Sequence, residues 1–328
     1  MRPLTGALFT SRRPFVLSIA LILVLILSAI PAATALAATF VVDTTVDNGA
    51  LNACTAAAND CSLRGAINRA FLTAGADTIT FGLNGTFTLT GAAGNDTNAS
   101  GDLDIDADGG NLTIVGNGTT NTIISGGNID RVFDIDPNND AATTQVTLQD
   151  LRVTGGRVTA DGGGIRVQNG SGLTLIGVLV NNNNAASSGG PGGGNDGGGI
   201  WVGDDDGTTL TLTNTTVSNN TASDDGGGIS INENNGTVIS IAGSTISNNT
   251  ATDNAGGLDL NGGAVAISQT TISGNTTGAG SNGGGIRLQG GGSLTISQST
   301  ISGNAAGTNG SGGGIEAEGL PAGERRLH

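Results

Sequence analysis

The sequence predicts an all-β fold, a parallel β-helix in which short strands wind into a solenoid behind an N-terminal capping helix. Three observations favour it. A unit of about 29 residues recurs, apolar residues alternate with period two inside each unit, and Gly and Asn separate the alternating segments. A β-sandwich is the rival fold, but it gives no reason for a fixed period.

The first 37 residues are predicted to be a secretory signal peptide. Three arginines precede a 16-residue apolar run, Phe15–Ile30, and a small-residue exit ends at Ala37. The alternative is an uncleaved membrane anchor, because the run is only slightly shorter than a bilayer span. Cleavage predicts an exported protein, secreted or on the cell surface, with no membrane span remaining.

The composition excludes some partners and some chemistry. The segment after Ala37 holds 9 arginines against 27 acidic residues, and its net charge of −18 repels nucleic acid. The chain has neither Lys nor Tyr, and its one His is the last residue, His328. Histidine-dependent catalysis, a lysine Schiff base and a multi-His metal site are therefore excluded, and we expect no cofactor.

Residues 38–110 are predicted to form the N-terminal cap and the first strands. Within 62–75, apolar residues recur with helical spacing, Ser62 stands at the N-cap position and Gly75 follows the end. This helix is the natural cover for the first coil, whose strand edges would otherwise pair with other chains. Six residues separate Cys54 from Cys61 in an exported segment, so we expect one disulfide.

Residues 111–315 are predicted to be the β-helix repeats. The tetrapeptide Gly-Gly-Gly-Ile, or its variant Ala-Gly-Gly-Leu, recurs at spacings of 35, 29, 29, 28 and 29 residues. Each unit carries three short alternating segments and is too small to bury its own apolar face, so we expect three strands per coil and coils stacked about 4.8 Å apart. The last residues of the tetrapeptides are Ile165, Ile200, Ile229, Leu258, Ile286 and Ile315.

Two successive turn positions follow the third alternating segment of each unit. The first is Asn in three copies and Gly in two, an exchange that a left-handed backbone with positive φ permits. The second is Asn in every copy, which predicts a ladder of side-chain amides between neighbouring coils. The alternative is that these are ordinary polar loop residues. The predicted ladder residues are Asn183, Asn220, Asn249, Asn275 and Asn304.

Residues 316–328 are predicted to be irregular. Ile315 should begin another coil, but the composition changes after it and the chain stops at His328. We expect a truncated product, or an array whose last strand edge is open and prone to self-association.

Over about residues 39 to 315, this chain resembles a known family of proteins. The segment Cys61-Ser-Leu-Arg-Gly-Ala-Ile67 is similar to the Cys-Ser-Leu-Arg-Glu-Ala-Ile signature that opens many exported bacterial right-handed β-helix proteins. The Gly-Gly-Gly-Ile and Ile-Ser-Gly-Asn repeats are similar to those of polymorphic outer-membrane and adhesin-like proteins. The resemblance implies a right-handed helix, a surface or secreted location and adhesion. Gly65 departs from the family's Glu, so any role of that carboxylate is lost.

An acidic run is the best candidate for a metal site. Alternate residues from 102 to 108 are Asp, and residues 104–109 match the first half of a calcium loop. The twelfth position of that loop is Val115 rather than the expected Glu. The alternative is a strand whose acidic face is solvated. The candidate Ca²⁺ ligands are Asp102, Asp104, Asp106 and Asp108.

The function that the sequence favours is non-catalytic. We expect a structural or adhesive surface protein that binds an extracellular polysaccharide or a cell-surface component. The alternative is a polysaccharide lyase or glycosidase acting on an acidic polysaccharide, with Arg and Asp side chains as its catalytic groups. The only Trp, Trp201, makes a poor platform for sugar stacking. Asp196 and Asp225, which precede glycine corners, are candidates for an aligned acidic rim.

Overall fold

The computed structural model describes residues 37–318 except residue 95 and residues 107–109, 139–141, 188–194, 204–206 and 233–236. Of the signal peptide predicted at 1–37, only Ala37 belongs to the described residues. Asp108 and residues 319–328 also lie outside them. Among the described residues, no helix has the length and hydropathy needed to cross a membrane.

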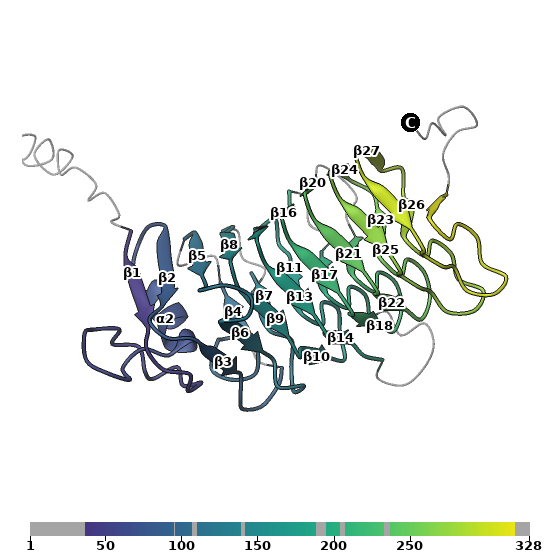
Figure 1. Ribbon diagram of the computed structural model, residues 1–328. Helices are drawn as coiled ribbons and strands as arrows, with labels where there is room; N and C mark the ends of the chain where they lie inside the picture. Colours follow the sequence, from purple (N-terminus) through teal and green to yellow (C-terminus); the bar gives the residue numbers. More distant parts are fainter. Residues whose placement is uncertain are drawn as a thin grey trace, which may run out of the picture. The chain divides into compact units, whose positions relative to one another are not determined.

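The described chain winds into four parallel sheets that run along a solenoid (Figure 1). Sheet 1 contains, in spatial order, β4 (Leu103–Ile105), β7 (Phe133–Ile135), β11 (Ile165–Val167), β15 (Ile200–Val202), β19 (Ile229–Asn232), β23 (Leu258–Asn261), β26 (Ile286–Gln289) and β29 (Ile315–Ala317). Sheet 2 contains β1 (Thr39–Val42), β2 (Asp77–Phe81), β5 (Leu112–Val115), β8 (Gln145–Gln149), β12 (Gly172–Ile176), β16 (Thr209–Thr213), β20 (Val238–Ala242), β24 (Ala264–Ser268) and β27 (Ser293–Ser297).

The other two sheets complete each coil. Sheet 3 contains β3 (Gly85–Thr88), β6 (Thr122–Ser125), β9 (Arg152–Thr154), β13 (Leu179–Asn181), β17 (Thr216–Ser218), β21 (Thr245–Ser247), β25 (Thr271–Ser273) and β28 (Thr300–Ser302). Sheet 4 contains β10 (Arg157–Val158), β14 (Asn184–Ala185), β18 (Thr221–Ala222) and β22 (Thr250–Ala251). The prediction of three strands per coil is therefore incomplete, because two-residue strands are too short to show a period in the sequence.

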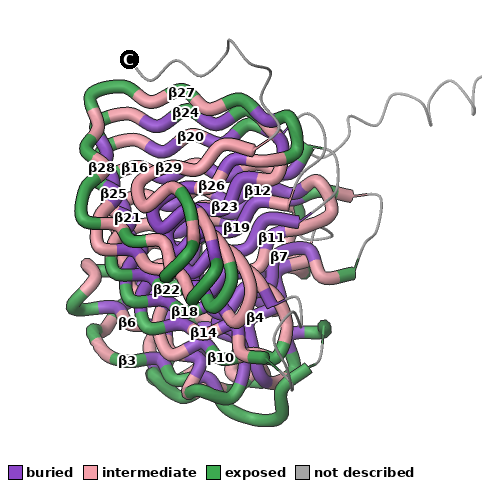
Figure 2. Tube along the Cα trace, turned by 90° about the vertical axis from the view of Figure 1, so that its right-hand side faces the viewer, coloured by how far each residue is buried: buried purple, intermediate pink, exposed green. Residues whose placement is uncertain are grey.

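The register of sheet 1 confirms the predicted stacking of the repeats. Ile200 pairs with Ile229, Ile229 with Leu258, and Leu258 with Ile286. Their side chains are fully buried and form one apolar column inside the solenoid. Figure 2 shows buried stretches of the strands running through the interior and exposed stretches mostly at the turns. An all-β parallel β-helix is the fold of this protein.

The turns after sheet 3 have the predicted backbone. Asn182, Asn219 and Asn248 have φ of 54°, 54° and 55°, and the copies that carry glycine, Gly274 and Gly303, have 65° and 64°. Asn and Gly exchange here because both tolerate the left-handed region at low steric cost.

The second turn position forms the side-chain ladder. Asn183, Asn220 and Asn249 each donate from Nδ2 to the Oδ1 of the next Asn in the array, over 3.0, 3.0 and 2.9 Å. The same Oδ1 atoms accept the backbone N–H of the preceding Asn over 3.0 Å. The step from Asn275 to Asn304 repeats the pattern. The first four of these residues are buried polar groups with satisfied hydrogen bonds rather than solvated loop residues, and Asn304 in the last coil is half-buried.

The glycine corners leave the space that the ladder occupies. A Cβ on Gly228, the third glycine of its triplet, would lie 2.5 Å from the carbonyl oxygen of Gly257 and 2.9 Å from Nδ2 of Asn249. Both distances are shorter than van der Waals contact. The triplet and the Asn ladder are thus two parts of one packing arrangement.

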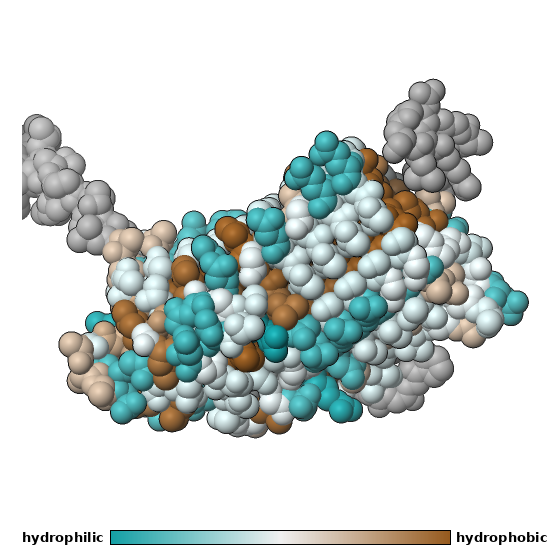
Figure 3. Space-filling view, in the orientation of Figure 1, coloured by the Kyte–Doolittle hydropathy of each residue, from teal (hydrophilic) through white to brown (hydrophobic). Residues whose placement is uncertain are grey.

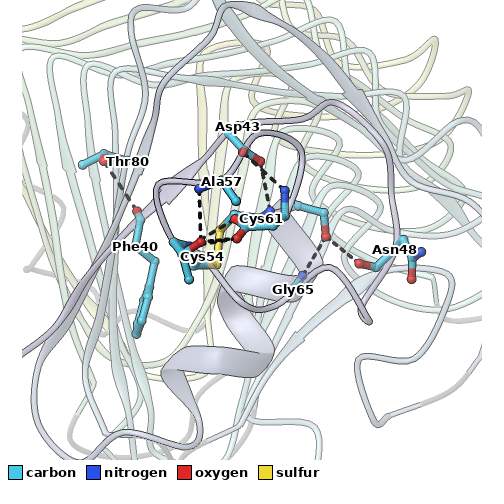
Figure 4. The surroundings of a disulfide bond; sticks show 11 residues. Phe40, Asp43, Asn48, Cys54, Ala57, Cys61, Gly65 and Thr80 are labelled. Atoms are coloured by element: carbon cyan, nitrogen blue, oxygen red, sulfur yellow. Dashed lines mark hydrogen bonds between the residues drawn. A yellow bond between two sulfur atoms is a disulfide. The ribbon is translucent and has the colours of Figure 1, made fainter.

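The N-terminal cap is built around α2 (Leu63–Ala70), which packs against β1 and β2. Ser62 is its N-cap, and Ser62 Oγ accepts the Gly65 N–H over 2.9 Å and donates to the Asn48 carbonyl (Figure 4). The helix ends five residues before Gly75, because Leu72 and Thr73 bond carbonyls three residues back instead of four. Cys54 and Cys61 form the predicted disulfide.

A buried arginine connects the cap to the first coil. Arg64, 1% exposed, forms a bidentate ion pair with Asp47 at 2.7 and 3.1 Å. The same guanidinium donates to the carbonyls of Gly101 and Asp102 and to the side chain of Asn98. The planar, five-donor shape of guanidinium suits this combination of a carboxylate and two carbonyls.

The last described coil leaves some of its apolar residues partly exposed. Leu294, Ile296 and Ile301 pack against the core but are only partly buried. β29 pairs with β26 and reaches Ala317, two residues beyond the predicted end of the repeats. Self-association through this edge stays a prediction.

Candidate functional site

The middle residues of the sheet 1 strands form one outward column. In each strand the two flanking residues face the core, so the residue between them points to the other side of the sheet. Strand register aligns one such residue from every coil. We call this set the outer column of sheet 1: Asp104, Asp134, Arg166, Trp201, Ser230, Asp259, Arg287 and Glu316.

A second line of polar residues precedes the glycine corners, and we call it the corner ladder. Each side-chain oxygen accepts the backbone N–H of the corresponding residue in the next coil. Asp196 Oδ1 accepts from Asp225 over 2.9 Å, and Asp225 Oδ1 accepts from Asn254 over 2.6 Å. Asp161 and Asn282 continue the pattern at the two ends. Asp196 and Asp225 are thus aligned, as an acidic rim requires.

Arg287 joins the two lines of residues in the C-terminal coils. Its Nη1 lies 2.8 Å from Asp225 Oδ2 and 3.7 Å from Asp259 Oδ1, and its Nε lies 3.7 Å from Glu318 Oε1. Burial raises the pKa of Asp259 well above its usual value, and repulsion from Asp225 adds to this effect while Arg287 opposes it. The Arg287 side chain is only 12% exposed, and it compensates these carboxylates rather than pointing into solvent.

Trp201 lies in the same column but does not offer a free ring face. It is 8% exposed, and a Cβ on Gly203 would lie 2.5 Å from its six-membered ring. The indole is therefore packed against the backbone of the chain's own turn. This geometry agrees with the expectation that Trp201 is a poor platform for sugar stacking.

A second group of charges lies in the first coils, and we call it the N-terminal acidic cluster. Carboxylate oxygens of Asp96, Asp104 and Asp134 all lie within 4.8 Å of one another. Asp134 Oδ2 lies 2.5 Å from both Arg131 Nη1 and Arg166 Nη2. Asp104 and Asp134 are buried, while Asp96 is exposed. The cluster thus has a buried rear and one solvent-facing member.

The environment of this cluster disfavours ionised carboxylates. Burial is the largest cause that raises the pKa of Asp104, to about 8, and repulsion from Asp102, Asp134 and Asp96 adds to it. Burial likewise raises the pKa of Asp102 to about 7, although Arg131, 3.1 Å away, opposes the change. Of the two oxygens of Asp104, Oδ2 accepts the Asn98 N–H over 2.7 Å and Oδ1 has no hydrogen-bond partner.

The four predicted metal ligands do not share one environment in the structure. Asp102 and Asp104 are each 2% exposed, so the alternative of a solvated acidic face is wrong for both. The loop segment that includes Asn98 covers Asp104. Asp106 is half-buried and accepts a hydrogen bond from the Asn138 side chain. Asp108 lies outside the described residues.

Sequence reasoning missed four members of this site. Asp134, Arg131 and Arg166 were not singled out together, although the sheet register places Asp104 beside Asp134 and Asp134 beside Arg166. Aligning the first two irregular coils with the regular ones would have revealed this column. Asp96 gives no such signal, because it lies in a loop.

The outward side of sheet 3 is of a different kind. In β17, β21, β25 and β28, Thr and Ser flank an inward Val or Ile, so two hydroxyls per coil face outward. Neighbouring coils are in register, with about 4.8 Å between coils and about 6.6 Å between the two positions of a strand. We call this surface the hydroxyl face: Thr216, Ser218, Thr245, Ser247, Thr271, Ser273, Thr300 and Ser302. Ser218 is buried, at 8% exposed, and the other seven are half-buried or exposed. Figure 3 shows a broad area of intermediate hydropathy over these coils.

The fold defines a parallel β-helix solenoid, and comparison with known families agrees. Residues 138–319, more than half of the chain, match the family model described as right handed beta helix region. The chain therefore belongs to the right-handed β-helix family. It matches no curated protein and no solved structure. Adhesins and polysaccharide-degrading enzymes share this fold.

Proposed function

We propose that this protein is an exported surface β-helix with an adhesive role, and that its hydroxyl face binds a neutral extracellular polysaccharide. The single observation that supports the proposal is the register of that face, where Thr repeats at one position and Ser at another over four successive coils. Hydroxyls can donate and accept, so a regular array can bond repeatedly to a polymer that carries its own regular hydroxyls.

The charge distribution favours a neutral polymer over an acidic one. The chain carries 27 acidic residues against 12 arginines, so an anionic polymer is repelled at long range. The hydroxyl face itself has no charged side chain at its eight positions. Each contact is weak, and useful affinity would come from many coils binding one chain at once.

The N-terminal motif and the predicted export of the chain support the same proposal. The resemblance of residues 61–67 to the signature of exported surface proteins, together with the signal-like segment at 1–37, favours a location outside the cell. The disulfide between Cys54 and Cys61 is typical of that oxidising environment.

The experiment is a retention assay on insoluble polysaccharides. We expect the protein to bind cellulose or chitin, which are neutral, and not pectin or alginate beads. Thr271→Arg places a bulky cation on the hydroxyl face and should lower retention at least several-fold. Ala266→Arg is the matched control, because Ala266 is exposed in β24, on the sheet 2 side of the same coil. Failure to bind any neutral polymer would refute the proposal.

A polysaccharide-degrading enzyme is the second candidate, and one observation favours it. Asp225 and Asp259 lie 2.8 and 3.7 Å from Arg287 Nη1, and the pKa of Asp259 is raised, as a general acid requires. Against this candidate, Asp259 is only 3% exposed and cannot touch a polymer without movement of its neighbours. A product assay on pectin and alginate with Ca²⁺ decides between the candidates: cleavage that Asp259→Asn abolishes would establish the enzyme.

A further inference from the structure

We propose that Asp96, Asp104 and Asp134 bind one Ca²⁺ ion, which ties the loop before β4 to the first two coils of the solenoid. This site is separate from the hydroxyl face and does not depend on the proposed function. It also differs from the calcium loop considered from the sequence, because only Asp104 belongs to both sets.

The geometry brings three segments of the chain to one point. Asp96 comes from the loop before β4, Asp104 from β4 and Asp134 from β7, and one carboxylate oxygen of each lies within 4.8 Å of the others. Oxygens around a common Ca²⁺, each about 2.3–2.6 Å from the ion, have separations of this size. The cluster therefore needs only small side-chain movements to coordinate an ion.

An unpartnered buried oxygen points to a ligand. Asp104 is 2% exposed, and its Oδ1 has no hydrogen-bond donor. A buried carboxylate oxygen without a partner is costly, and proteins usually satisfy such a group with a donor, a water or a cation. Asp102 Oδ1 is also buried without a partner, so the shortage of positive charge extends beyond one residue.

Carboxylates outnumber guanidiniums around the cluster. Asp96, Asp102, Asp104 and Asp134 face two guanidiniums, those of Arg131 and Arg166, which both bind Asp134.
Asp130, which is 2% exposed and also repels Asp102, adds a further carboxylate. At least two negative charges are thus uncompensated when these groups are ionised, which favours binding of a divalent cation.

Ca²⁺ fits the donors better than other common cations. All the donors are oxygens, which excludes metals that prefer sulfur or imidazole. Ca²⁺ accepts six to eight oxygens in flexible geometry, whereas Mg²⁺ demands a near-ideal octahedron. The exposed carboxylate of Asp96 leaves a path by which the ion can enter, and water can complete its coordination.

A second acidic group in the described residues lacks these features. Asp224, Asp225 and Asp253 also bring carboxylate oxygens within 4.8 Å, but they are half-buried or exposed. Asp225 is paired with Arg287, and Asp253 accepts the Ser281 hydroxyl over 3.0 Å. This group is therefore an ordinary acidic surface.

The test treats the full-length chain with a chelator and then titrates it with CaCl₂ in a calorimeter, which measures the heat of binding. Melting curves are recorded in Ca²⁺ and in EDTA. We expect about one Ca²⁺ per chain and a melting temperature several degrees higher in Ca²⁺, since an ion that binds only the folded state stabilises it. Equal melting curves, or no heat of binding, would overturn the proposal.

Two variants separate the proposed site from the calcium loop. Asp104→Asn should weaken Ca²⁺ binding at least about tenfold and remove the temperature shift. Asp106→Asn, in the same segment, should bind as the wild type does, because Asp106 contacts Asn138 instead. Loss of binding in Asp106→Asn, or unchanged binding in Asp104→Asn, contradicts the assignment.

A third variant covers the case in which Asp104→Asn fails to fold, which circular dichroism will reveal. Asp96 is exposed, so Asp96→Asn should fold normally and should still weaken binding. Wild-type affinity in Asp96→Asn would overturn the three-ligand site. MgCl₂ that reproduces the full temperature shift would overturn the choice of calcium.

Discussion

Asn220 donates its side-chain Nδ2 and its backbone N–H to the same oxygen, Oδ1 of Asn249, over 3.0 Å in each case. Its Nδ2 also donates to the carbonyl of Val180 in the preceding coil, over 3.1 Å. Each interior amide of the ladder, Asn220, Asn249 and Asn275, therefore uses both of its donors and accepts two bonds. Such a group is satisfied only while its neighbours on either side have the same side chain.

Breaking the ladder in its middle should be costly. Asn249→Asp removes the donor to the carbonyl of Val217 and places an acidic oxygen 2.9 Å from Oδ1 of Asn275. We expect the free energy of unfolding to fall by roughly 3 kcal/mol, because a buried charge then lacks a partner. Urea denaturation followed by circular dichroism measures this loss.

The matched control is the neighbouring turn residue. Asn248 is exposed with a φ of 55°, and later copies carry glycine there. Asn248→Gly should therefore change stability by less than about 0.5 kcal/mol. If both variants lose the same stability, the ladder is not the cause.

The ladder could be predicted from the sequence because comparing the repeats indicates the backbone conformation at each turn position. The exchange of Asn and Gly at one position and the constancy of Asn at the next are both visible in five aligned copies. The buried pairs of Arg131 and Arg166 with Asp134 could not be predicted in the same way. Arg131 and Asp134 lie in a coil whose sequence diverges from the repeat, and Arg166 is 32 residues from its partner Asp134.

One copy of the glycine corner stores backbone strain. Ala255 has a φ of 55° at the position where other corners carry glycine, for example Gly226 with 66°. An L-residue in the left-handed region costs about 1–2 kcal/mol. We expect Ala255→Gly to stabilise the protein by about 1 kcal/mol, even though a buried methyl group is lost, and a thermal melt can measure the gain.

The reverse change provides the comparison. At Gly226 a Cβ would lie 2.7 Å from the carbonyl oxygen of Ile229, so Gly226→Ala should destabilise by more than about 1 kcal/mol. A lower melting temperature for Ala255→Gly would show that the methyl group contributes more than the strain costs.

Replacing the glycine in α2 by alanine should change the stability in the opposite direction from the one that helix propensity predicts. In an exposed helix, Gly→Ala stabilises by about 1 kcal/mol. At Gly65, however, a Cβ would lie 1.9 Å from the carbonyl oxygen of Leu51, which accepts the Ser62 N–H. We therefore expect Gly65→Ala to destabilise by at least about 2 kcal/mol, as overpacked sites do.

Hydrogen exchange of the α2 backbone amides measures the local stability of the cap in each variant. The control is Arg69→Ala, at a less buried position in the same helix, which changes propensity without adding a clash. Faster exchange in Gly65→Ala alone supports the steric account. Equal or slower exchange would mean that Leu51 moves aside at little cost. The departure from the family's Glu at this position would then have no packing reason.

Titration of Asp196 should make the stability of the corner ladder depend on pH. Burial raises the pKa of Asp196 to about 7, and repulsion from Asp161 and Asp225 adds to the effect. The unfolded carboxyl has a pKa of about 3.9, so between pH 4 and 7 the unfolded chain releases a proton that the folded chain retains. Stability is therefore lost as pH rises through this window, and the loss is complete above about pH 7.

Asp196→Asn keeps the oxygen that accepts the Asp225 N–H and cannot ionise, and Asn254, two coils further along, accepts the corresponding N–H in this way. The variant should match the wild type at pH 4 and exceed its free energy of unfolding by up to about 4 kcal/mol at pH 8. Urea denaturation at several pH values measures the difference. Asn254→Asp, the reverse exchange two coils further along, should introduce the same pH dependence. Parallel curves for wild type and Asp196→Asn would show that this carboxylate ionises in the folded protein without cost.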